Sequence, residues 1–218
     1  MKKYQTNKLF YNKYFFKLCL YNPIGHIFRN RNFRHARKVL DELQADYERG
    51  IQLTLSGSLR TKPVRERDFL DARNLYSFLT NIDDYAMRIE YNNLCLYSNN
   101  KDELLSLEPI LSKDAIHSFH APTEKAQKLL KKNVILTEDK DFPYLYKVTL
   151  GWTKNAQGFA NWAKSNPKQI RIGTTLLNEL AENKYVDNMY FYARDDRTLQ
   201  LVDLMLNSIR RIEKIVKT

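Results

Sequence analysis

Histidine and carboxylate side chains are the groups of this chain whose spacing could support acid–base or metal chemistry. His117 and His120 form a local pair, and histidine titrates near neutral pH, as a general acid or base must. A three-residue spacing on a strand puts the rings on opposite faces, and no Cys or carboxylate stands at ligand spacing on a helix. We expect no metal site here, and the pair are catalytic candidates only if the protein cleaves RNA.

Acidic residues cluster at Asp83-Asp84, Glu138-Asp139-Asp141 and Asp195-Asp196. A two-metal nuclease needs such groups converging from separate elements, whereas these clusters fall at expected helix ends or turns, where Asp caps backbone N–H groups. The sequence contains no Walker loop, GxGxxG, HExxH or CxxC motif. We therefore expect no metal and no cofactor, and the balance favours a protein that is not an enzyme.

Positive charge is concentrated in the first forty residues, which contain ten Lys or Arg and no Asp or Glu. The formal net charge of the chain is +11, so the 26 basic and 25 acidic residues of 41–218 nearly cancel. Nine aromatic residues are interleaved with the N-terminal cations. Cations that neutralise phosphates, beside rings on which bases stack, are typical of a nucleic-acid-binding surface. A solvated basic face, an acidic protein partner and membrane headgroups are the alternatives.

The densest cationic tract, residues 29–38, crosses the expected start of a helix, where basic side chains oppose the helix dipole unless an anion binds. The phosphate-contacting candidates in this tract are Arg29, Arg31, Arg34, Arg37 and Lys38. We expect its four arginines to be exposed on one contiguous positive surface of residues 1–40. The candidates that could extend the track are Lys17, Lys147, Arg210, Arg211 and Lys214. The stacking candidates are Tyr11, Phe33 and whichever of Tyr14 and Phe16 faces away from the core.

Matching segments indicate an internal duplication of the chain. Residues 14–20 resemble residues 144–150, and both alternate large side chains as a half-buried strand does. A later pair, residues 94–104 and 190–199, each read as a strand, a polar turn and an amphipathic helix. A stretch with a strand-like alternation of side chains follows each of these two segments. The second of these stretches, residues 209–216, would equally form a long helix.

The first half has the element order βαββαβ, with a second helix inserted, which RNA-recognition modules share. The second half is a poorer copy, in which residues 169–172 are the one candidate for a short additional strand. We predict an α+β fold of two ferredoxin-like halves with helical insertions. The basic N-terminal half spans residues 1–124, residues 125–140 form a linker, and residues 141–218 form the C-terminal half.

The two cysteines, Cys19 and Cys95, lie in apolar alternating runs, which predicts buried reduced thiols and a reducing compartment. No stretch approaches the ~20 apolar residues of a membrane span, so no membrane partner is expected. The abundance of Asn, Lys and Tyr is typical of an AT-rich genome such as that of a phage. We expect a cytoplasmic protein, in the host cytoplasm or the virion if it is phage-encoded.

These observations favour a non-enzymatic nucleic-acid-binding accessory protein of replication, transcription or packaging. RNA or single strands are favoured over duplex DNA, because no helix reads as a major-groove reader. One alternative is a metal-independent endoribonuclease on a tandem ferredoxin-like scaffold using His117 or His120, although the glycine-rich loop of such enzymes is missing after Gly173. The other is a virion structural or assembly protein whose basic arm contacts the genome, or viral or host proteins.

Overall fold

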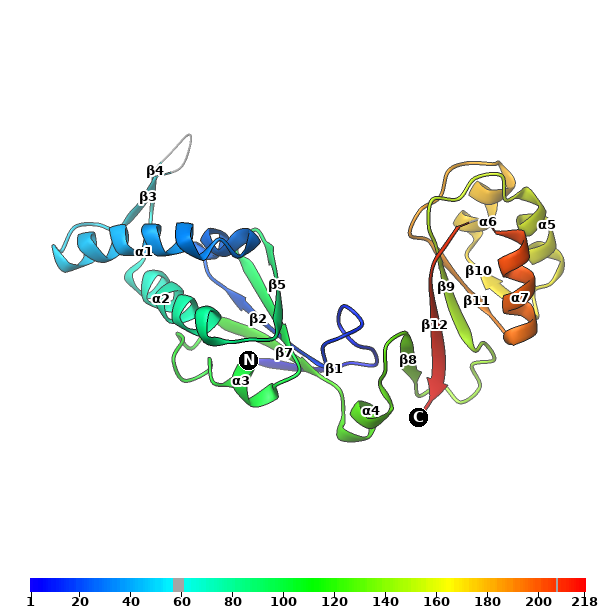
Figure 1. Ribbon diagram of the computed structural model, residues 1–218, viewed down its shortest axis with the longest axis horizontal. Coiled ribbons are helices and arrows are strands. Elements are labelled where there is room, and N and C mark those ends of the chain that lie inside the picture. The colour runs from blue at the N-terminus through cyan, green and yellow to red at the C-terminus, as the bar shows by residue number, and fades with distance from the viewer. Residues whose placement is uncertain (57–60, 207) are drawn as a thin grey trace. The chain divides into compact units, whose positions relative to one another are not determined.

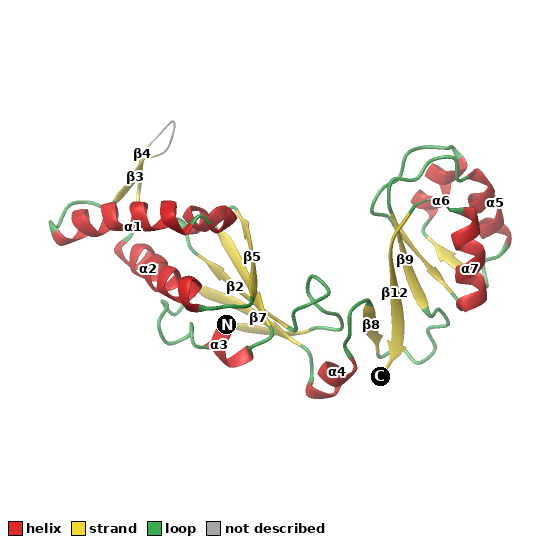
Figure 2. Ribbon diagram, in the orientation of Figure 1, coloured by secondary structure: helices red, strands yellow, loops and turns green. Residues whose placement is uncertain are grey.

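A computed structural model of the protein describes residues 1–56, 61–206 and 208–218. They form two compact units, each built on its own five-stranded mixed sheet (Figure 1). Unit 1 contains residues 1–6 and 13–123, and unit 2 contains residues 7–12 and 124–218. Both units contain helices and strands, so the predicted α+β class is confirmed (Figure 2).

The sheet of unit 1 has the strand order β1-β7-β2-β6-β5. Its strands are β1 (Lys2–Gln5), β2 (Phe16–Tyr21), β5 (Tyr85–Glu90), β6 (Asn93–Ser98) and β7 (Ile116–Ala121). β1 runs parallel to β7, and all the other neighbours are antiparallel. A separate two-stranded sheet pairs β3 (Thr54–Ser56) antiparallel with β4 (Thr61–Pro63). The helices are η1 (Gly25–Arg31), α1 (Phe33–Glu48), α2 (Glu66–Asn81) and α3 (Lys101–Leu105).

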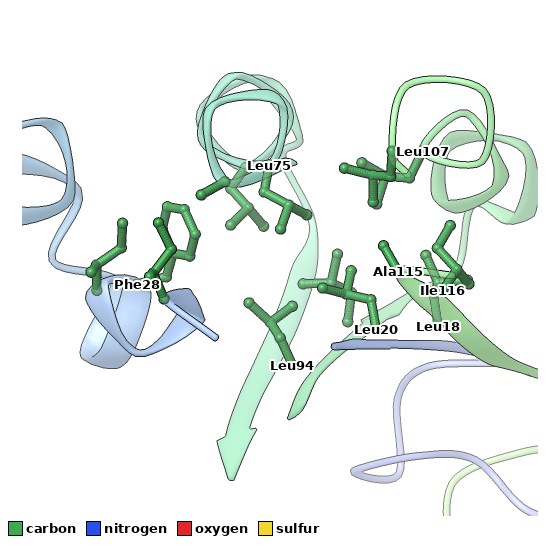
Figure 3. Packing of buried hydrophobic residues seen from close by; sticks show 14 of the residues in the cluster. Leu18, Leu20, Phe28, Leu75, Leu94, Leu107, Ala115 and Ile116 are labelled. Atoms are coloured by element: carbon green, nitrogen blue, oxygen red, sulfur yellow. The ribbon is translucent and has the colours of Figure 1, made fainter. Parts of the chain in front are cut away.

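The core of unit 1 lies between one face of this sheet and its helices. Alternate residues of β2 and β6, such as Leu18 and Leu94, meet residues at helical spacing on α1 and α2, such as Leu40 and Leu75. Figure 3 shows Leu75 and Phe28 approaching the leucines of the sheet. Each buried leucine contributes roughly 1.5–3 kcal/mol, so the pattern fixes which face of the sheet the helices cover.

The sheet of unit 2 has the order β10-β11-β9-β12-β8. Its strands are β8 (Val134–Thr137), β9 (Tyr146–Leu150), β10 (Ile170–Ile172), β11 (Tyr190–Ala193) and β12 (Ile209–Lys217). The helices are α4 (Glu124–Leu129), α5 (Gln157–Ser165), α6 (Thr174–Ala181) and α7 (Asp196–Met205). Buried residues of α5, α6 and α7 pack on Val148 and Phe191, so these three helices gather on one face (Figure 1).

The two units repeat one topology. In each unit, four strands lie in the sheet as fourth, first, third and second. The order is βαββαβ in unit 1, with α2 inserted, whereas unit 2 has one more helix, α6, between its second and third strands. These strands are β2, β5, β6 and β7 in unit 1, and β9, β10, β11 and β12 in unit 2. A preceding strand, β1 or β8, adds to the edge in parallel with the fourth. This shared topology agrees with the predicted duplication, and the ferredoxin-like description remains our interpretation of it.

The predicted linker is wrong, because residues 125–140 contain most of α4 and all of β8. β8 is a short apolar run that pairs in parallel with β12, so its burial depends on a partner about eighty residues away. Residues 7–12 also belong to unit 2: the Asn7 Nδ2 atom donates to the Leu136 carbonyl at 3.1 Å, and the Leu136 N–H donates to the Asn7 carbonyl at 2.8 Å. The ambiguous C-terminal stretch is the strand β12.

Cys19 and Cys95 form a disulfide, which contradicts the prediction of reduced thiols. The two residues are register partners on β2 and β6, with Cα atoms 4.2 Å apart. This proximity arises from strand pairing across 76 residues and leaves no local signal in the sequence. Stable disulfides belong to oxidising environments, so the cysteines no longer support a reducing compartment. None of the helices in the described part of the chain combines the length and apolar character needed to cross a membrane.

Candidate nucleic-acid interface

Each sheet carries a row of polar and aromatic residues that alternate with its core residues and therefore face away from the core. We call these surfaces polar face 1 and polar face 2. Register pairs place four side chains of polar face 1 in one row, Tyr4, His120, Lys17 and Tyr97. The corresponding row of polar face 2 contains Arg171, Tyr192, Lys147 and Glu213, with Tyr190 and Arg211 in the next row.

A lysine opposite a tyrosine occupies equivalent positions in the two faces. Lys17 on the first strand of the unit 1 motif pairs with Tyr97 on the third, and Lys147 pairs with Tyr192 in the same way. The Lys17 Nζ atom lies 5.9 Å from the centroid of the Tyr97 ring. The Lys147 Nζ atom lies 3.9 Å from the centroid of the diagonal neighbour Tyr190. Both sheets thus hold an ammonium group against an aromatic ring at their centre.

Polar face 2 carries a cluster of aromatic rings. The Tyr192 ring lies 5.7 Å from Tyr190, 5.2 Å from Phe142 and 6.3 Å from Tyr144, measured between centroids. The Arg171 guanidinium lies 6.0 Å from the Phe142 centroid. Tyr190 is 48% exposed, so one of its surfaces is open to a ligand. An unpaired base could stack there within reach of both cations.

The cations of polar face 2 surround a buried carboxylate. Glu213 is 3% exposed, and the Arg211 Nε atom lies 3.4 Å from its Oε2 atom, which accepts no hydrogen bond from the described residues. Burial lowers the pKa of the Lys147 ammonium; Glu213 opposes this shift, while Lys8 and Arg211 add to it. Glu213 therefore attracts both Lys147 and Arg211 at the centre of the sheet.

A cavity of about 290 Å³ opens beside Lys147 within unit 2. Its lining includes the ammonium-bearing Lys8 and Lys147 and the rings of Phe142 and Tyr192. The Lys8 backbone reaches this place through an antiparallel bridge to Ile135. Ligand pockets usually measure about 300–1,000 Å³, so this one suits a single base or a phosphate.

Polar face 1 is more closed. The Tyr97 ring is 5% exposed, whereas Tyr4 remains exposed and stacks on His120 with centroids 4.8 Å apart. The His120 Nε2 atom lies 3.2 Å from the Ser118 Oγ atom. The accessible aromatic surface of this face therefore lies at its β1 edge.

The histidine pair lies where the β2–β7 register shifts. The shift between Cys19 and Leu20 leaves His117 outside the ladder, so the strand alternation that predicted opposite faces is interrupted. Burial, followed by the positive charge of Lys17, lowers the pKa of both imidazoles, and His117 adds to the effect on His120. Both rings are therefore neutral at neutral pH. In the described part of the chain, no three His, Cys, Asp or Glu side chains are grouped to hold a metal ion.

The cationic tract at the start of α1 is exposed, as predicted for Arg29, Arg31, Arg34 and Arg37. The Arg31 guanidinium donates to the Tyr85 carbonyl and lies 4.2 Å from the centroid of the Tyr85 ring. Arg31 therefore also links the start of α1 to β5. Asn32 caps α1 by accepting from the His35 N–H at 3.1 Å, and the first turn contains no acidic residue.

Two further members of the tract form weak ion pairs. Arg37 and Lys38 lie 3.7 and 4.0 Å from Asp41 and Glu42, and such exposed pairs leave the cations available to phosphates. Residues 1–40 are divided between the two units, because residues 7–12 belong to unit 2, and their expected contiguous surface stays a prediction.

Several aromatic stacking candidates have structural roles instead. Tyr14 and Phe16 are both buried, so neither faces away from the core. Phe33 packs on the core and lies 6.3 Å from the Tyr76 ring, which contradicts its predicted role in base stacking. Tyr11 is exposed, with a positive φ of 52°.

The C-terminal basic candidates lie on β12. Arg210 lies 3.8 Å from an Asp187 oxygen, Arg211 belongs to polar face 2, and Lys214 is exposed. Sequence reasoning missed the aromatic cluster, although the alternation of Tyr190-Phe191-Tyr192 places two tyrosines on one face of a strand.

The acidic clusters divide between caps and ion pairs. The Asp195 Oδ1 atom accepts from the Thr198 N–H at 2.8 Å, and the Asp139 Oδ1 atom accepts from the Asp141 N–H at 3.0 Å, as expected for caps and turns. Asp84 instead pairs with the Lys13 ammonium at 2.5 Å and accepts from the Tyr14 hydroxyl at 3.1 Å.

The geometry is the basis for assigning a function to these surfaces. No protein-family model matches the chain, and no curated protein or solved structure resembles it closely enough to count as a match. The two polar faces and the cationic tract of α1 are thus interpreted from their own chemistry.

Proposed function

We propose that the protein binds single-stranded nucleic acid through its polar faces, as a non-enzymatic accessory of replication, transcription or packaging. The observation that carries the proposal is the exposed Tyr190 ring beside the Lys147 ammonium on polar face 2. The lysine–tyrosine register pair recurs on polar face 1, where the accessible ring is Tyr4. A sheet that presents aromatic rings beside cations can stack bases and neutralise phosphates at the same time. A phage-encoded protein of this kind would act in the host cytoplasm or the virion.

Polar face 2 supports this proposal most directly. Its exposed Tyr190, the ammonium of Lys147 and the small cavity between Lys8 and Tyr192 suit unpaired nucleotides. Stacking of one base contributes about 1–3 kcal/mol. The exposed cations of α1 would add phosphate contacts that do not depend on the base sequence.

The test is fluorescence anisotropy of a labelled oligouridylate titrated with the full chain at several salt concentrations. The slope of log affinity against log salt should be about −0.7 for each phosphate contacted. Lys147→Ala should weaken binding and make the slope less negative by about 0.7, the value for one phosphate contact. Lys164→Ala, which removes the same charge from an exposed position on α5, serves as the matched control. Absence of binding at low salt, or an affinity independent of salt, would contradict the proposal.

The same mixtures test the ribonuclease alternative, for which the neutral imidazoles of His117 and His120 near Lys17 are the supporting observation. We expect the RNA to stay intact both with EDTA and with Mg²⁺ or Mn²⁺. Cleavage that survives EDTA and disappears in His117→Ala or His120→Ala would replace the binding proposal with the enzymatic one.

A further inference from the structure

Unit 2 exposes two large aromatic rings beyond the ends of β9 and β11. Trp152 is 78% exposed and Tyr185 is 66% exposed, and their ring centroids lie 6.2 Å apart with the planes inclined by 56°. The Lys154 Nζ atom lies 4.8 Å from the Tyr185 centroid. Exposed Trp and Tyr rings side by side cost free energy to hydrate. Such a pair therefore marks a surface that is stabilised when a binding partner covers it.

The loops that carry these rings are braced. The backbones of Thr153 and Val186 exchange hydrogen bonds of 3.0 and 3.2 Å. The Asn183 Oδ1 atom accepts from the Asn155 N–H at 2.7 Å, while its Nδ2 atom donates to the Asn155 Oδ1 atom at 3.0 Å. Thr153 is buried, and its hydroxyl donates to the Gly151 carbonyl at 3.0 Å. The rings are therefore presented by a fixed scaffold, which lowers the entropic cost of binding.

This scaffold continues the sheet of polar face 2. Thr149, the register partner of Tyr190, precedes Trp152 by three residues, a distance of about 10 Å along a strand. Stacked nucleotides advance by about 3.4 Å, so a strand lying on Tyr190 would reach Trp152 within a few bases. Lys154 lies against the Tyr185 ring, which favours a polyanion as the occupant, whereas the neighbouring Lys184 ammonium is paired with Glu182 at 2.6 Å.

We propose that Trp152 and Tyr185 form a second stacking site, occupied by bases of the same single strand that lies on polar face 2. This inference rests on the proposed function. The bases provide the rings that cover Trp152 and Tyr185, and the phosphates between them face Lys154.

The test uses the full chain carrying Trp162→Phe, which leaves Trp152 as the sole tryptophan. Its emission is followed during titration with an oligouridylate of about twelve nucleotides, an abasic oligomer of equal charge and an oligoglutamate peptide. We expect quenching by the oligouridylate alone. Trp152→Ala, measured by anisotropy, should weaken oligouridylate binding about tenfold and leave the affinity for the abasic oligomer unchanged. Leu204→Ala removes another highly exposed apolar side chain of unit 2, at 83%, and is the matched control.

Three outcomes would overturn the inference. If the oligouridylate binds but leaves Trp152 emission and the Trp152→Ala affinity unchanged, the second stacking site is refuted and the proposed function stands. If the oligoglutamate quenches Trp152 and the oligouridylate does not, the rings belong to an interface with an acidic protein. If no oligonucleotide binds the wild-type chain, both proposals fail together.

Discussion

Reduction of the Cys19–Cys95 disulfide should destabilise unit 1 selectively. The bond closes a loop of 76 residues, and loop-closure entropy then gives a stabilisation of about 4.5 kcal/mol at 25 °C, towards the upper end of the usual range. The loop contains α1, α2, β5 and parts of β2 and β6, so most of the core of unit 1 lies inside it. Unit 2 contains neither cysteine.

Hydrogen exchange read by peptide mass spectrometry separates the two units. In a urea series, peptides of β2 and β6 should lose protection at lower urea after reduction, or in the Cys19→Ser and Cys95→Ser double variant. Both tryptophans, Trp152 and Trp162, lie in unit 2, so their emission reports that unit independently.

Two results would refute this reasoning about the disulfide. One is alkylation of both cysteines in the unreduced protein after unfolding, which would show that the bond is not formed. The other is that the bond is present but its reduction changes the unfolding free energy of unit 1 by less than about 1 kcal/mol. That result would show that closing the loop does not stabilise unit 1 through the entropy of the unfolded chain.

Acid should destabilise unit 1, because burial and Lys17 depress the folded-state pKa of His117 and His120. The two imidazoles then bind protons more readily in the unfolded chain than in the folded one. Their contribution to the stability of unit 1 is therefore fully present above about pH 6.5 and is lost as the pH falls through the folded-state pKa values. Urea midpoints between about pH 7.5 and 5 measure this, and His120→Asn should reduce the drop. Asp195→Ala should cost about 1 kcal/mol of unfolding free energy by removing the α7 cap, and Asp203→Ala, exposed on the same helix, should leave urea unfolding unchanged.

The central strands and main helices could be predicted because their periodicity records burial. β2 and β9 alternate core and polar side chains, and α1 and α2 show stripes at helical spacing, so each local pattern also points to the covered face. β1 could not be predicted in this way. Its four residues are all exposed, and it is held by parallel backbone pairing with β7, which no side-chain period reports.

Part of the candidate nucleic-acid interface could be predicted from the sequence for the same reason. The repeat placed Lys17 and Lys147 at equivalent positions, and the register confirms that equivalence. The position of Phe142 against Tyr192 depends on a loop folding back over the sheet, a contact between segments fifty residues apart. The disulfide and the bulge at His117 likewise follow from register, which the composition of a single strand does not encode.

The acid-free N-terminal segment distributes its charge over separate structural elements. Lys8 joins β8 of unit 2 and lines the cavity beside Lys147, while Lys17 occupies the centre of polar face 1. Arg34 and Arg37 remain on the exposed surface of α1. The excess charge therefore places cations beside aromatic rings at two sheet faces and on one helix. Phosphates bound at any of these places would interact with charges fixed by backbone pairing or by a helix, and this pre-organisation is what separates a binding surface from a solvated basic tail.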